Sequence, residues 1–232
     1  MLHPARQVRA SAASFHDLLV SHRRKESTLL KDTRTALLEV QWVERTDYMG
    51  AWYLATFDHD RGVRGSARRS WDSVFKARDD AAPPYTFEEM IPTLWDYAQE
   101  TALGRTAQVA NVSDETADDV ALVKAQAILA LAELLHRASS AETLSEERLT
   151  VVGSDEVWEL FSPTQPTVAR TACCTLLESA ASLTASEPLL VNLKGVAHRV
   201  LGNCWNEGDG WAGIITFLRS ECSVLHRLED MS

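Results

Sequence analysis

Apolar residues recur at helical spacing along most of the chain, and Ala51–Phe75 shows the pattern most clearly. An apolar stripe at i, i+3 and i+4 spacing predicts a helix that ends near Phe57. Asp58 and Asp60 interrupt the stripe, and the Asp60 carboxylate can cap a second helix by accepting hydrogen bonds from free backbone N–H groups. The second helix has its own stripe: Val63, Ala67, Trp71, Val74 and Phe75. Two such helices joined by an acidic corner need stacked neighbours to bury their apolar faces.

A turn followed by a valine and, four residues later, an alanine occurs twice more. Val8 and Ala12 have this spacing at the start of the chain, and Val168 and Ala172 have it near the end. Three copies indicate HEAT-type repeats, and the alternative is three unrelated amphipathic helices that each follow a turn. The first copy, with its stripe continuing through Phe15, Leu18 and Leu19, has no preceding partner helix. We therefore expect the chain to be a fragment of a longer protein.

Helical patterns also occupy the segments between and after these copies. The further predicted helices are Ser27–Arg45, Phe87–Leu103, Thr116–Ala138, Ser154–Phe161, Glu187–Cys204 and Gly210–Leu228. Thr116–Ala138 is the most apolar and is expected at the centre of the core. Thr86 is expected to cap the helix that follows it, although Pro92 favours a helix start nearer Ile91.

No segment has the alternating pattern of a convincing strand, so the predicted fold is all-α. The stacked helix pairs indicate a HEAT/ARM-type α-solenoid of antiparallel pairs. We expect one solenoid segment over residues 1–232, with repeat-like units near 1–45, 47–78, 87–138, 154–182 and 187–228. His16 and His136 lie near apolar faces and are expected to be packed. So are four of the seven tryptophans: Trp52, Trp71, Trp95 and Trp158.

Charge is distributed unevenly along the chain, whose net charge is −10. Residues 1–78 carry 14 Lys and Arg against 9 Asp and Glu, a net charge of +5, and the remainder carries 9 against 24, a net charge of −15. This division suggests one face made for an anionic partner. No apolar run approaches the roughly 20 residues that a membrane span needs, and the first residues lack a signal peptide's apolar core. We expect a cytosolic protein without a membrane partner.

Candidate catalytic chemistry is scarce. The pairs Asp79-Asp80 and Asp118-Asp119 suggest a magnesium site, but neither is followed a turn later by the further carboxylate that such a site needs. The sequence contains no P-loop, no dinucleotide-binding glycine motif, no nucleophile elbow and no paired histidine spacing. We therefore expect no catalytic, cofactor-binding or metal-binding residue in this chain.

The four cysteines contain no CxxC pair, which favours free thiols in a reducing compartment. They are Cys173, Cys174, Cys204 and Cys222. A zinc site built from Cys204 and Cys222 with His198 and His226 is the alternative, but it lacks any known ligand spacing.

At the acidic corner the sequence resembles a known family. The run MGAWYLATFDHDRGVRGSARRSWDSVF is similar to the amino-terminal HEAT region of listerin, the ubiquitin ligase of ribosome-associated quality control. The matching positions are Gly50, Ala51, Trp52, Phe57, Asp58, Asp60, Val63 and Ala67. ARQVRASAASFHDLL upstream, and FEEMIPTLWDYAQET, VALVKAQAILALAELL and VWELFSPTQPTVARTACCTLLESA downstream, follow the family's order, so the resemblance covers most of Arg6–Ala180. The segment Ser21–Thr46 is longer than the family's pattern leads us to expect.

The resemblance implies a long HEAT/ARM solenoid whose amino-terminal end docks on the large ribosomal subunit, on both its RNA and its protein. It also implies contact with the quality-control factor that holds peptidyl-tRNA there. A distant carboxy-terminal RING would bind zinc, recruit a ubiquitin-conjugating enzyme and mark the stalled nascent chain. The paired cysteines of a RING do not occur in this sequence, so this chain would supply docking. The alternatives are an unrelated HEAT scaffold or adaptor protein with no ligase role and an all-α enzyme.

The basic first third supplies candidate ribosome-facing residues: Arg61, Arg68 and Arg69. They lie off the apolar stripe of their helix and are expected to face the solvent, where they could contact ribosomal RNA phosphates. Arg6 and Arg9 lie one repeat earlier. For Arg9 and Arg64 we favour a structural role, because arginine at this position of a HEAT unit often bonds a neighbouring repeat's aspartate.

Overall fold

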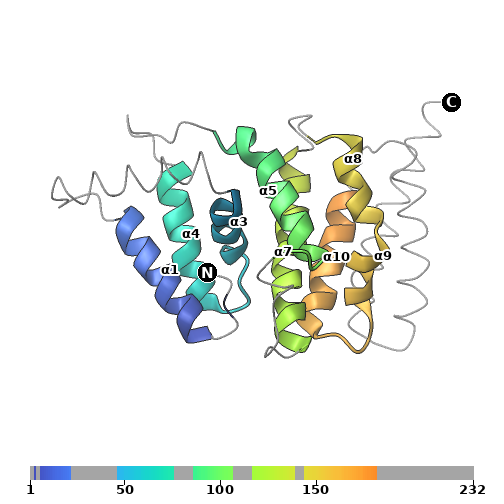
Figure 1. Cartoon of the computed structure of the whole chain (residues 1–232), viewed down its shortest axis with the longest axis horizontal. Helices are drawn as coiled ribbons and strands as arrows, with labels where there is room; N and C mark the ends of the chain where they lie inside the picture. Colours follow the sequence, from blue (N-terminus) through green and yellow to red (C-terminus); the bar gives the residue numbers. More distant parts are fainter. Residues whose placement is uncertain are drawn as a thin grey trace. The chain divides into compact units, whose positions relative to one another are not determined.

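The computed structural model describes residue 3 and residues 6–21, 46–75, 86–106, 117–138 and 144–181, and every regular element among them is a helix (Figure 1). The helices pack against one another as in α-solenoids, which confirms the predicted all-α fold class. The chain divides into two units, Met1–Glu115 and Thr116–Ser232. The single solenoid segment with its five repeat-like units stays a prediction. The predicted helices Ser27–Arg45, Glu187–Cys204 and Gly210–Leu228 lie outside the described residues.

The first unit contains α1 (Arg6–Ser21), α3 (Thr46–Ala55), α4 (Arg61–Phe75) and α5 (Phe87–Ala102). Helix α4 packs along α1 and also contacts α3, and α3 packs on α5 (Figure 1). The predicted stripe of α4 is buried at Val63, Ala67, Trp71 and Val74, whereas Phe75 is half-buried. The apolar spacing in this helix therefore predicted the packed face correctly.

Trp52 of α3 is the centre of the first unit's core. Its ring meets the Trp71 ring edge-on, with centroids 4.9 Å apart, and lies 4.2 Å from the imidazole of His16 on α1. The indole Nε1 donates a hydrogen bond to Ser70 Oγ at 2.9 Å, so the buried tryptophan keeps its polar group satisfied. Three helices thus meet on one aromatic side chain.

The predicted apolar stripe of α1 is not the face that packs. Val8, Phe15 and Leu18 are 47%, 64% and 58% exposed, and Ala12 is only half-buried. The buried side chains are instead those of Arg9, Ala13 and His16. The prediction for this helix was wrong because the pairing of the Arg9 guanidinium, described below, turns the arginine inward and the neighbouring apolar positions outward.

The second unit is built on α7 (Ala117–Ala138), which packs along α10 (Thr167–Ala181). In the sequence, four short elements separate these two helices: α8 (Glu146–Leu149), η1 (Thr150–Gly153), α9 (Asp155–Trp158) and η2 (Glu159–Phe161). Most of α7 is buried, as predicted for the most apolar helix. Val168 is 41% exposed, however, and Ala169 and Ala172 are buried. For the third repeat copy, the predicted burial is therefore correct for the alanine and wrong for the valine.

Two tryptophans of the packed set, Trp95 and Trp158, are buried as predicted, like Trp52 and Trp71. Trp158 Nε1 donates to the Val152 carbonyl oxygen at 2.7 Å. His16 is also buried, but His136 is exposed in the last turn of α7, so the prediction that it packs was wrong.

The ends of α5 show how local sequence sets helix boundaries. Thr86 caps the helix in a capping box, in which Glu89 N donates to Thr86 Oγ1 and Thr86 N donates to the Glu89 carboxylate at 2.7 Å. This cap starts the helix at Phe87, so the expectation of a start near Ile91 was wrong, and Pro92 lies inside the helix. Gly104, with φ of 76°, follows the last turn, where glycine is the residue best suited to a left-handed backbone.

Among the described residues, no helix combines the length and the apolar character that crossing a bilayer demands.

Replacing Gly50 with alanine should destabilise the first unit. A Cβ atom at Gly50 would lie 2.1 Å from Tyr97 Cγ, in the contact where α3 packs on α5. Because Tyr97 is buried and its ring cannot easily move, we expect the free energy of unfolding to fall by roughly 1–3 kcal/mol. Denaturant unfolding would measure the change.

Gly65 is the matched control, because a Cβ there lies no closer than 3.6 Å to another side chain, Arg69 Nη1. Gly65→Ala in the interior of α4 should stabilise the protein by about 0.5–1 kcal/mol. Equal stability of the two alanine variants would contradict the close approach of α3 to Tyr97.

Unfolding should also depend on pH through His16. Burial lowers the pKa of this imidazole from 6.5 to about 4, and its Nδ1 has no hydrogen-bond partner among the described residues. Below pH 6.5 the unfolded chain therefore takes up a proton that the folded chain refuses until about pH 4. Stability is fully present above pH 6.5 and is lost as the pH falls, by about 2 kcal/mol between pH 7.5 and pH 5.

Chemical denaturation at these two pH values would test this, with His16→Gln and the exposed His136→Gln compared. His16→Gln should lose most of the pH dependence, and His136→Gln should keep it. If both variants retain the wild-type difference, His16 is not the responsible group.

Candidate functional site

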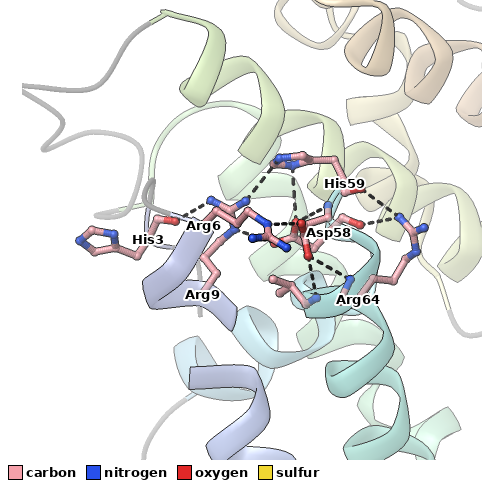
Figure 2. A network of polar contacts seen from close by, with 9 residues as sticks. His3, Arg6, Arg9, Asp58, His59 and Arg64 are labelled. Carbon is pink, nitrogen blue, oxygen red and sulfur yellow. Dashed lines mark hydrogen bonds and ion pairs between the residues drawn. The ribbon is translucent and has the colours of Figure 1, made fainter. Parts of the chain in front are cut away.

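The corner between α3 and α4 contains a buried carboxylate, that of Asp58, which is fully inaccessible to solvent (Figure 2). Its Oδ2 accepts a hydrogen bond from Arg9 Nε at 2.8 Å, and its Oδ1 accepts one from the backbone N–H of Asp60 at 2.8 Å. The His59 ring lies beside it, with Nδ1 3.5 Å from Oδ1. A buried charge of this kind is tolerated only when it is paired and hydrogen-bonded.

Arg9 satisfies the other half of this requirement. Its side chain is buried, and besides Asp58 its guanidinium donates to the carbonyl oxygen of His3 at 2.9 Å and lies 3.3 Å from His59 Nε2 (Figure 2). The ion pair joins α1 to the corner across 49 residues of sequence. This confirms the structural role predicted for Arg9.

Asp60 caps α4 as predicted. Its Oδ1 accepts hydrogen bonds from the backbone N–H groups of Gly62 at 2.9 Å and Val63 at 3.1 Å. Its other oxygen pairs with Arg6 Nε from the start of α1. The hydrogen bond from Arg6 and the backbone N–H of Val63 lower the pKa of Asp60 to about 2. The carboxylate is therefore ionised throughout the physiological pH range.

Arg64 of α4 is held at the same corner by backbone groups. Its Nη1 donates to the carbonyl oxygen of Asp58 at 2.6 Å and lies 3.5 Å from that of His59 (Figure 2). The predicted structural role of Arg64 is thus met through a carbonyl oxygen rather than through an aspartate side chain.

The three candidate ribosome-facing arginines are all exposed on α4, as their positions off the apolar stripe predicted. Arg61 makes no hydrogen bond or ion pair to any part of the chain that the structure describes. Arg68 Nε donates to the Thr56 carbonyl oxygen at 2.9 Å, and its guanidinium lies 5.9 Å from the centre of the Phe57 ring. Arg69 pairs with Asp17 Oδ2 at 3.0 Å and donates to Ser66 Oγ at 2.9 Å.

Residues suited to metal chemistry are not brought together in the described ranges, where no three His, Cys, Asp or Glu side chains could hold an ion. Asp118 and Asp119 lie in the first turn of α7. Cys173 and Cys174 carry thiols and form no disulfide, as predicted, and burial raises the pKa of the Cys173 thiol. Asp79, Asp80 and the alternative zinc ligands Cys204, Cys222, His198 and His226 lie outside the described residues.

Comparison with known families gives a match over nearly the whole chain. The family model of the E3 ubiquitin-protein ligase listerin, N-terminal domain, matches residues 1–219. The chain belongs to the listerin family. No curated protein and no solved structure gave a significant match. The matched region contains the whole corner, so the resemblance first seen at Gly50–Ala67 extends over both ends of the Arg9–Asp58 ion pair.

Sequence reasoning predicted that His16 packs, but it missed the carbonyl contact of His3 and the inward face of α1 as a whole. The signal for the inward face of α1 was present, since Arg9, Ala13 and His16 are spaced i, i+4 and i+7. A face that contains arginine and histidine does not resemble a packed face until its partner is known.

Removing either member of the Arg9–Asp58 pair should strongly destabilise the first unit. Asp58→Asn leaves a buried guanidinium without its counter-ion, and Arg9→Met leaves a buried carboxylate, so each should lower the free energy of unfolding by about 3–5 kcal/mol. The double variant should cost clearly less than the sum of the two single variants. Denaturant unfolding of all four proteins gives the coupling, and strict additivity would show that the pair does not act as a unit.

Proposed function

We propose that this chain is the amino-terminal docking segment of a listerin-like RING E3 ubiquitin ligase, and that it binds the large ribosomal subunit so that stalled nascent chains are marked for degradation. The family match over residues 1–219 carries this proposal. The proposed partners are the RNA and protein of the large subunit and the factor that holds peptidyl-tRNA. In this proposal zinc and the ubiquitin-conjugating enzyme would be bound by the RING of the full-length ligase, and the location is the cytosol.

In the proposed mechanism this chain binds the ribosome and thereby positions the rest of the ligase. A helical surface that is already ordered loses little conformational freedom on docking, so more of the contact energy remains as affinity. The Arg9–Asp58 pair and the α1–α4 packing hold α1, the corner and α4 together, and helix α4 itself keeps its exposed arginines at a fixed spacing. The ligase chemistry would then occur at a position set by this contact.

The charge of the first third supports docking on ribosomal RNA. Residues 1–78 carry the chain's positive excess, and the exposed Arg61, Arg68 and Arg69 lie on one helix within it. Contacts between arginine and phosphate release counterions, so binding through them weakens as the salt concentration rises. The acidic remainder of the chain would be repelled by RNA, which orients the docking.

Binding to purified large ribosomal subunits across a salt series would test the proposal. The Arg61/Arg68/Arg69→Glu variant should bind on the order of tenfold more weakly or worse, and its affinity should depend less steeply on salt, because up to three phosphate contacts are lost. The matched control is Arg105/Arg137/Arg170→Glu, which makes the same change of charge just after α5 and on α7 and α10.

Correct folding of both variants would be checked by circular dichroism and thermal melting. Wild-type affinity and salt dependence in the folded α4 variant, or equal losses in the two variants, would exclude this surface as the docking face. Failure of the wild-type chain to bind the subunit at low salt would contradict the docking function itself.

A further inference from the structure

Three carboxylates near the contact between α1 and α4 form ion pairs with particular arginines. Asp17 pairs with Arg69, Asp58 pairs with Arg9, and Asp60 pairs with Arg6. In each pair the negative charge offsets the positive one. These three arginines therefore add little net charge to the surface.

Helix α4 contains Arg69 and three further arginines. These three have no carboxylate partner in the described part of the chain: Arg61, Arg64 and Arg68. Arg64 and Arg68 are anchored by the carbonyl oxygens of Asp58 and Thr56, at 2.6 Å and 2.9 Å. A carbonyl oxygen positions a guanidinium without cancelling its charge. The Phe57 ring lies 5.9 Å from the Arg68 guanidinium and adds a weak cation–π contact.

These three residues form a row along one side of the helix. Their spacing is i, i+3 and i+7, which places them on a single stripe about 10 Å long. The backbone N–H groups at the start of α4 are already used by the Asp60 carboxylate, so the helix terminus offers no anion site of its own. An anion would have to bind the arginine side chains.

We propose that Arg61, Arg64 and Arg68, called here the α4 arginine row, bind consecutive phosphates of an RNA backbone. This rests on the proposed function in that the RNA is taken to be ribosomal. A row of separated like charges fits a polymer that repeats its phosphates. A phosphopeptide presents one phosphate, which is best held by donors that converge on a point, and the row does not converge.

The anchoring also prepares the row for binding. Arg68 uses Nε for the Thr56 carbonyl, and Arg64 uses Nη1 for the Asp58 carbonyl. The other guanidinium nitrogens of each residue can donate to an anion, as in the charge-assisted hydrogen bonds between arginine and phosphate. Because these side chains are already held, less rotamer freedom is lost on binding.

Arg137 is the matched control, because it is an exposed helical arginine, on α7, whose charge is offset by Glu133. The probe is a fluorescent synthetic 20-nucleotide RNA, single-stranded or duplex, titrated with the full 232-residue chain at several salt concentrations. Arg61→Gln, Arg64→Gln and Arg68→Gln should each reduce the slope of log affinity against log salt by about 1. Arg137→Gln should leave the slope close to wild type.

Arg64→Gln could disturb the corner itself, so Arg64→Lys is included. Lysine keeps the charge but not the guanidinium geometry, and it should retain the salt slope while weakening affinity. Equal slopes for Arg68→Gln and Arg137→Gln would overturn the proposal. So would efficient competition by an equimolar singly phosphorylated peptide.

The same variants titrated against large subunits separate this inference from the proposed function. If the wild-type chain binds subunits but its RNA affinity does not respond to the α4 arginine row, only the inference fails. If the row governs RNA binding but the wild-type chain does not bind subunits, RNA recognition stands and the ribosomal docking fails.

Discussion

The buried ion pair between Arg9 and Asp58 is the interaction on which the first unit depends. A guanidinium and a carboxylate that have both left water must face each other, and this requirement decides how α1 is rotated on α4. That rotation brings His16 against Trp52 and leaves Val8, Phe15 and Leu18 outside. It also places Asp17 within reach of Arg69 and Arg6 within reach of Asp60. The pattern of neutralised and available charge on α4 is a consequence of one ion pair.

Features that depend on neighbouring residues could be predicted from the sequence. The Asp60 cap, the Thr86 cap and the packed stripe of α4 each arise from contacts within one helix turn or one apolar face. The face of α1 could not be predicted in this way. Its apolar residues outnumber the single arginine that decides the rotation, and the partner of that arginine lies 49 residues later. Val168 was misplaced for a related reason, because counting apolar residues does not say which helix face meets a neighbour.

The candidate site illustrates the same limit in terms of charge. The sequence separates the arginines of residues 1–78 only by their positions relative to an apolar stripe or a repeat. Among the described ones, Arg6, Arg9 and Arg69 are offset by a carboxylate, whereas Arg64 and Arg68 are anchored by neutral carbonyl oxygens and Arg61 has no partner in the described residues. The arginines without a carboxylate partner retain a full charge for an anionic partner. The proposed partner follows from membership of the listerin family, but the sorting of the arginines comes from the three-dimensional contacts alone.

The two ends of α1 are attached to the rest of the unit by groups that respond differently to acid. At its amino-terminal end, the Asp60 carboxylate that pairs with Arg6 stays charged down to about pH 2. Farther along, the contact with Trp52 is made by the His16 imidazole, whose neutral form is favoured by burial. Mild acidification would therefore detach the carboxy-terminal half of α1 first. The amino-terminal end, which the corner holds, would detach last.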